Sequence, residues 1–147
     1  MTMSQELLKK VYPVHGRNFD KAGEAATAIK QLLKELELDA ALIHRAVVVA
    51  FEAEMNVVMY ANEGVVTLVL TDDDIRLQIS DDGPGIEDIA LALTEGYSTA
   101  TNEMREMGFG FGMGLPNIQK HSDVFHIESV VGAGTTVSSV IRLNASS

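Results

Sequence analysis

Two glycine-rich segments contain the residues best suited to binding a ligand. They are residues 81–86, with the sequence DDGPGI, and residues 108–115, with the sequence GFGFGMGL. Glycine lets the backbone approach a ligand closely and adopt positive φ. Where such a segment runs into a helix, the first peptide N–H groups can hold phosphate oxygens. The two segments together indicate a nucleotide pocket. It is not a Walker A loop, because the sequence contains no G-x-x-x-x-G-K-[ST].

A carboxylate and a carboxamide, Glu52 and Asn56, lie four residues apart in an otherwise apolar segment. On a helix this spacing places both side chains on one face. In one interpretation they bond each other or nearby backbone, since an unsatisfied buried polar group costs ~1–3 kcal/mol. In the other, Asn56 coordinates Mg²⁺ and Glu52 orients and deprotonates an attacking hydroxyl. Glu54 lies about 200° round the helix from Glu52, and we expect it to be a solvated or partner-facing charge.

Asp81 opens the first glycine segment at the end of an expected strand. Its carboxylate can accept a hydrogen bond from the 6-amino group of adenine, where guanine carries a carbonyl. Alternatively, it caps the following helix or starts a turn, with Gly83 and Gly85 as turn residues. Thr135 is either a residue that favours strands or a hydroxyl that shares a water or a base nitrogen with Asp81. We expect Asp82 to take an exposed turn position.

The elements that position these residues follow from hydrophobic periodicity and turn signals. Hairpin-paired strands, with helices gathered on one face, predict an α+β fold: a two-layer sandwich with a mixed, mainly antiparallel sheet. By its length the chain, residues 1–147, is expected to form one domain. The predicted elements are an edge strand over 9–14, a helix over 19–36, a buried helix from an Asp39 N-cap to about Ala61, hairpin strands over 65–71 and 75–80, a short helix over 86–93, a lid loop over 94–111, a helix over 112–121, and strands over 124–130 and 135–143.

Composition and charge restrict the kinds of partner. The chain is 46% hydrophobic and 22% charged, as is typical of soluble globular proteins, and it has no apolar run long enough to span a bilayer. Its formal net charge of −10 argues against nucleic acid, which requires a basic patch. The absence of cysteine excludes disulfides and fits a reducing cytoplasm. Because the chain is acidic and offers few cations, the phosphates of a bound nucleotide would need Mg²⁺ and backbone dipoles.

The order of the motifs resembles a known family. E-x-x-x-N, D-x-G-x-G-I, G-x-G-x-G-L and G-T occur in the order and spacing of the GHKL (Bergerat-fold) ATPases, over residues 11–143. The short chain, the segment 95–99 (EGYST) and the segment 112–116 (GMGLP) resemble more particularly the bacterial anti-sigma-factor and switch-protein serine kinases. The resemblance implies the Bergerat ATP-binding fold.

The resemblance also implies a role for each matching residue. Glu52 matches the catalytic base and Asn56 the Mg²⁺ ligand. Asp81 matches the acid that reads adenine, with Thr135 assisting. The other matches are the glycines beside the base and ribose (Gly83, Gly85), the lid hydroxyls that can touch a phosphate (Ser98, Thr99), and the phosphate-binding loop at a helix start (Gly110, Gly112, Gly114, Leu115).

The implied function is an ATP-dependent protein serine/threonine kinase that regulates a partner protein in bacterial transcriptional or stress signalling. Its implied partners are a STAS-type antagonist as substrate, a sigma factor or a phosphatase, and a second copy in a homodimer. One alternative is a nucleotide-gated, partner-sequestering module without significant kinase activity, since the methionine-rich segment 104–113 suits adaptable contacts. Another is the stand-alone catalytic domain of a histidine-kinase-like system, although the four histidines are scattered.

Overall fold

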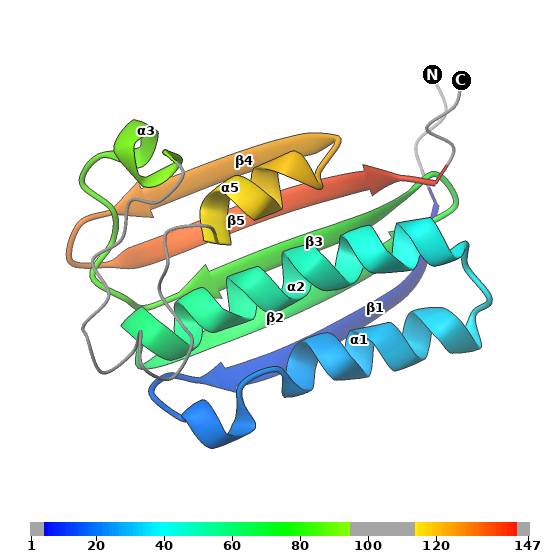
Figure 1. Ribbon diagram of the computed structural model, residues 1–147, viewed down its shortest axis with the longest axis horizontal. Coiled ribbons are helices and arrows are strands. Elements are labelled where there is room, and N and C mark those ends of the chain that lie inside the picture. Colours follow the sequence, from blue (N-terminus) through cyan, green and yellow to red (C-terminus); the bar gives the residue numbers. More distant parts are fainter. Residues whose placement is uncertain (1–4, 95–113, 144–147) are drawn as a thin grey trace.

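The computed structural model describes residues 5–94 and 114–143. Its five strands form one sheet in the order β1-β2-β3-β5-β4, and every neighbouring pair is antiparallel. The helices lie on one face of this sheet (Figure 1). The predicted two-layer α+β architecture is therefore confirmed, although the sheet of the described residues is wholly antiparallel rather than mixed. The elements are β1 (Glu6–His15), η1 (Phe19–Lys21), α1 (Glu24–Glu35), α2 (Ala40–Tyr60), β2 (Glu63–Thr71), β3 (Asp74–Asp81), α3 (Ile89–Ala92), α5 (Gly114–Lys120), β4 (Val124–Val130) and β5 (Gly134–Arg142).

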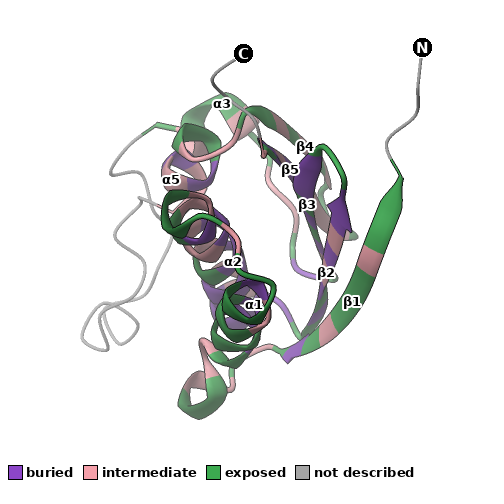
Figure 2. Ribbon diagram, turned by 90° about the vertical axis from the view of Figure 1, so that its right-hand side faces the viewer, coloured by how far each residue is buried: buried purple, intermediate pink, exposed green. Residues whose placement is uncertain are grey.

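The core lies between the inner face of the sheet and the helices. In β2 and β3, alternate side chains point inward and are buried, so the period-two pattern of both strands is satisfied. Helix α2 lies over the middle of the sheet, with α1 on one side and α5 on the other (Figures 1 and 2). Its apolar circumference is explained by this position, because neighbours cover it on several sides. Its fully buried residues include Ala46, Val49, Val57 and Val58.

The single helix predicted over residues 19–36 is wrong. The chain forms the short η1, and α1 begins at Glu24. The break falls at Gly23, whose φ of 98° is a left-handed conformation that glycine adopts at little cost.

The start of α1 is held by Glu54 of α2. This carboxylate accepts hydrogen bonds from the backbone N–H groups of Gly23 (3.0 Å), Ala25 (3.2 Å) and Ala26 (2.9 Å). The side chain is 2% exposed, so the expectation of a solvated or partner-facing charge is wrong. The physical reason is that the first N–H groups of a helix have no partner within the helix and carry partial positive charge. Because α1 packs on this side of α2, Glu54 supplies the missing acceptors.

Other element boundaries follow local signals. Asp39 caps α2 as predicted, accepting from the Ala41 N–H at 3.1 Å. Of the short helix predicted over 86–93, only the four residues of α3 are helical. Asp88 caps α3 by accepting a hydrogen bond from the Leu91 N–H (3.0 Å). The helix predicted over 112–121 is confirmed as α5 within the described residues, whereas nearly all of the lid lies outside them.

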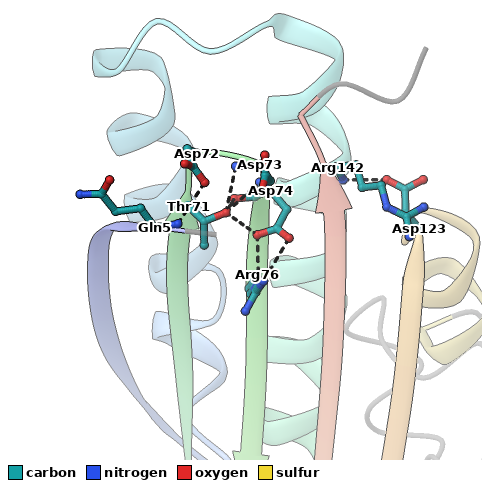
Figure 3. Close-up of polar contacts among 8 residues, drawn as sticks. All are labelled: Gln5, Thr71, Asp72, Asp73, Asp74, Arg76, Asp123 and Arg142. Carbon is teal, nitrogen blue, oxygen red and sulfur yellow. Dashed lines mark hydrogen bonds and ion pairs between the residues drawn. The ribbon is translucent and has the colours of Figure 1, made fainter. Parts of the chain in front are cut away.

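The hairpin turn between β2 and β3 is fixed by a buried hydroxyl (Figure 3). Thr71 Oγ1 accepts from the N–H groups of Asp73 (3.1 Å) and Asp74 (3.0 Å) and donates to Asp74 Oδ1 (2.7 Å). Arg76 then pairs with the Asp74 carboxylate at 3.0 Å. This network sits at the start of β3, whereas Asp81 lies at its other end. It thus fixes the strand from which Asp81 projects.

No helix in the described parts of the chain is long and apolar enough to cross a membrane.

We predict that Glu54→Gln lowers the free energy of unfolding by about 2–3 kcal/mol, because a neutral amide replaces a charged acceptor of buried N–H groups. Chemical denaturation monitored by circular dichroism measures this change. The control is Glu35→Gln at the exposed end of α1, which should stay within about 0.5 kcal/mol of the wild type. Equal effects of the two substitutions would contradict the role given to Glu54.

Candidate functional site

Glu52 and Asn56 lie half-buried on the side of α2 that faces the start of α5. A Cβ placed on Gly114, the first residue of α5, would lie 3.2 Å from Asn56 Oδ1 and 3.5 Å from Glu52 Oε2. A side chain at this position would therefore press on the Asn56 amide and come into contact with the Glu52 carboxylate. The structure brings these three predicted site residues together, and the absence of a side chain at Gly114 lets the helix begin against the pair.

Burial raises the pKa of the Glu52 carboxyl, because a desolvated carboxylate loses hydration. A side-chain hydrogen bond from Asn117 and the positive potential of His121 partly oppose this rise in pKa. Asn117 is not among the residues that the sequence motifs predict for the site. A usable signal was present, since Asn117 lies three residues after Gly114 and so on the same side of α5. A carboxyl with a raised pKa, beside an amide and a helix start, has the properties of a general base.

Asp81 forms a second group with residues of β5 and the glycine segment. Its Oδ1 accepts from the N–H groups of Gly83 (2.8 Å) and Thr135 (3.3 Å). Burial raises the pKa of Asp81, these two amides lower it, and the neighbouring charge of Asp82 raises it further. The bond to Gly83 fits the alternative in which Asp81 starts a turn, and it leaves the adenine contact as a prediction. The alternative that Asp81 caps the following helix is wrong, since α3 is capped by Asp88.

The glycine segment is docked against the turn between β4 and β5. Gly85 has a φ of 81°, and a Cβ there would overlap the carbonyl oxygen of Val130. The Pro84 carbonyl accepts from the Gly132 N–H at 2.8 Å. On the other side, Gly134 has a φ of 140°, and its Cβ would overlap the carbonyl oxygen of Asp81. Only glycine fits both close approaches without strain.

Helix α2 connects the two groups. Tyr60 follows Asn56 by four residues, about 6 Å along the helix, and its carbonyl oxygen lies 3.4 Å from a Cβ placed on Gly83. Glu52, Asn56 and Tyr60 thus follow one stripe of α2 towards Asp81. Asp82 is exposed as predicted, and its carboxylate accepts from the N–H groups of Asn62 and Glu63, both at 2.9 Å. That contact joins the end of β3 to the connection between α2 and β2.

Some predicted residues do not join this arrangement. Leu115 is half-buried and packs against the hydrophobic core. The predicted lid and loop residues fall outside the described ranges: Ser98, Thr99, Gly110 and Gly112.

The donors beside Gly114 suit a hard cation. Mg²⁺ prefers oxygen ligands and is commonly held by one or two side chains together with substrate phosphates. Asn56 supplies an amide oxygen and Glu52 a carboxylate beside the same helix start. Across residues 5–94 and 114–143, no three His, Cys, Asp or Glu side chains gather into a metal site. The oxygens of Asn56 and Glu52 are thus of the kind that a Mg²⁺ held partly by substrate phosphates would need.

The fold and the site define a class of nucleotide-binding domain. A helix-borne acid–amide pair faces a helix start, and a carboxylate at a strand end faces a glycine turn, over one antiparallel sheet. The family described as histidine kinase-, DNA gyrase B-, and HSP90-like ATPase matches residues 25–145, and the chain belongs to this family.

Similar proteins with assigned names indicate which branch of this family the chain resembles. The chain is 30% identical to the serine/threonine-protein kinase RsbT of Bacillus subtilis (strain 168) over 93 residues, which cover 60% of this chain and 64% of RsbT. It is 33% identical to the anti-sigma F factor of Caldanaerobacter subterraneus subsp. tengcongensis over 91 residues, 58% of this chain and 60% of that protein. It is 32% identical to the anti-sigma F factor of Thermoanaerobacter sp. (strain X514), over the same shares. The matches span less than two thirds of these relatives. The predicted resemblance to GHKL kinases of the anti-sigma-factor type is confirmed.

The raised pKa of Glu52 has a consequence for stability. Because the folded state disfavours the ionised carboxyl, stability is fully present below the pKa of the unfolded chain and decreases as pH rises through the folded pKa. We therefore predict that Glu52→Gln raises the Tm at neutral pH and leaves it unchanged in acid, below the ordinary glutamate pKa. Thermal melts across this range test the prediction, with Glu35→Gln as the exposed control. A Tm increase of equal size at both extremes would show that charge is not its cause.

Proposed function

We propose that this chain is an ATP-dependent protein serine/threonine kinase that phosphorylates a small partner protein in a bacterial transcriptional or stress-signalling switch. The supporting observation is the half-buried Glu52, whose pKa is raised, beside Asn56 and the start of α5. The similarity to RsbT and to the anti-sigma F factors is consistent with this assignment. We place the reaction in the cytoplasm.

The chemistry follows from the positions of the described residues. Phosphoryl transfer mainly requires positioning and neutralisation of charge. Asp81 accepts the 6-amino group of adenine, and Asn56 holds a Mg²⁺ that, when bound, neutralises phosphate charge. Glu52 takes the proton of the partner's hydroxyl, whose oxygen then bonds the terminal phosphorus while the bond to the bridging oxygen breaks and ADP leaves. A carboxylate with a raised pKa is a stronger base than an ordinary one.

The partners are proposed from the family resemblance, and the sigma factor also from the names of the relatives. We propose a STAS-type antagonist as the substrate, with a sigma factor bound directly or a phosphatase acting in the same switch. A homodimer is the proposed assembly. The anti-sigma F factors support the sigma-factor partner, because their names describe that class of interaction.

A second candidate function is a nucleotide-gated module that sequesters its partner without significant kinase activity. The observation favouring it is that several relatives are named for anti-sigma activity rather than for a kinase reaction. In that case, the same pocket controls partner binding through nucleotide occupancy.

We predict that Glu52→Ala reduces phosphoryl transfer by at least about 100-fold, the typical contribution of a general base, while the Kd for ATP changes by less than about threefold. Transfer is measured with labelled ATP and candidate antagonist proteins, and affinity by isothermal titration. Absence of transfer by the wild type, together with nucleotide-dependent partner binding, would favour the sequestering module. Loss of affinity matching the loss of rate would remove Glu52 from the role of base.

We predict that Asp81→Asn weakens ADP binding by about tenfold or more, because the amide replaces a charged acceptor for the 6-amino group. The wild type should prefer ADP to GDP, and the substitution should reduce this preference. Titration of both nucleotides with and without Mg²⁺ measures base selectivity and metal dependence together. A preference unchanged by the substitution would place the base elsewhere.

A further inference from the structure

Helices α2 and α5 pack antiparallel, and their contacts fix which residues lie opposite one another. At the start of α5, a Cβ placed on Gly114 would be 3.2 Å from Asn56 Oδ1. Just beyond its other end, Arg45 donates to the His121 carbonyl oxygen at 3.1 Å, and the rings of His44 and His121 lie 6.0 Å apart. Residue numbers therefore fall along α2 as they rise along α5.

This register places Asn117 opposite Glu52. Asn117 lies three residues after Gly114, about 4.5 Å along α5. Glu52 lies four residues before Asn56, about 6 Å along α2. The Asn117 side chain donates a hydrogen bond to the Glu52 carboxylate. The backbone of Asn117 is held as well, because its carbonyl oxygen accepts from His121 Nδ1 at 2.8 Å.

An asparagine amide is suited to holding a carboxylate that must act as a base. Its NH₂ group has two donors and no charge. It can fix one oxygen of the Glu52 carboxylate, while the remaining lone pairs stay available for the proton of the partner's hydroxyl. A lysine or arginine at this position would form a charged pair and favour the ionised carboxylate more strongly, which would make it a weaker base. Both side chains are half-buried, so water competes less for the hydrogen bond between them.

We infer that Asn117 is a positioning residue for phosphoryl transfer, which holds the Glu52 carboxylate in the orientation that accepts the proton of the partner's hydroxyl. This inference rests on the proposed function and adds a residue of α5 to the groups supplied by α2. In this role Asn117 acts through Glu52, and nucleotide binding does not depend on it. The alternative is a structural role, in which the amide only helps to pack α5 against α2.

Transfer from labelled ATP to candidate antagonist proteins tests this role. Asn117→Ala should lower kcat about ten- to a hundredfold, the effect of losing a hydrogen bond to a charged group and of misplacing a reacting group. The KM for ATP should change by less than about threefold. Asn117→Asp keeps the shape of the side chain but loses its donors, so kcat should fall at least as far. Wild-type kcat in Asn117→Asp overturns the inference. The matched control is Gln119→Ala on the exposed side of α5, which should leave both constants unchanged.

A double-mutant cycle with Glu52 separates positioning from packing. If Asn117 acts through Glu52, adding Asn117→Ala to Glu52→Ala should not lower the residual rate further. If Asn117 only packs α5 against α2, the two losses should multiply, and the inference is overturned. An unchanged kcat in Asn117→Ala overturns the inference alone, because wild-type transfer would still support the kinase. Absence of transfer by the wild type overturns both the inference and the proposed function.

A measurement that needs no Asn117 variant and no kinase activity tests the contact itself. In ¹H–¹⁵N correlation spectra of the labelled protein, the side-chain amide signals of Asn117 should move in Glu52→Gln, because their acceptor loses its charge. They should stay in place in Glu35→Gln, the exposed control on α1. Signals that do not move in Glu52→Gln overturn the inference, even if Asn117→Ala does not fold.

Discussion

Helix α2 must be buried while it carries three polar functional groups. These groups belong to Glu52, Glu54 and Asn56. Ala53, which lies between the two glutamates, is 2% exposed. Among the described residues, no buried side-chain nitrogen or oxygen lacks a hydrogen-bond partner. Burial without partners would be costly, so the surroundings of α2 must supply them. The positions of α1 and α5 follow from this constraint, since each brings backbone or side-chain groups to the polar positions of α2.

The two acids of α2 show how surroundings separate structural from chemical roles. Glu54 accepts hydrogen bonds from three backbone N–H groups at the start of α1, and these bonds stabilise its buried charge. Glu52 is less buried but has one side-chain hydrogen bond, from Asn117, and its pKa is raised. An acid whose charge is compensated by several hydrogen bonds has a structural role. An acid whose charge is only partly compensated retains a tendency to take up a proton, which a general base requires.

The sequence predicted what depends on local pattern. Strand alternation, the Asp39 cap and the spacing of Glu52 and Asn56 each led to an element or a pair that the structure contains. It did not predict the role of Glu54, because helical spacing gives the direction of a side chain but not which helix packs there. Asn117 was missed for a similar reason. Its position after Gly114 indicates its side of α5, but only the packing of α5 against α2 brings it to Glu52.

The two ends of the site are held by different kinds of structure. At Asp81, sheet register and the close approaches of Gly85 and Gly134 leave little freedom, so the atoms that would read a base are fixed by the backbone. At Glu52, the position depends on how α5 is held against α2. Besides the contact with Asn117, Arg45 of α2 donates to the His121 carbonyl at the end of α5 (3.1 Å) and pairs with Asp123 (3.3 Å). A cation beside the last carbonyl groups of a helix is favourable. Helix α2 therefore holds α5 at its middle, through Asn117, and just beyond its C-terminal end, through Arg45, so one element sets the distance between the proposed base and the helix start opposite it.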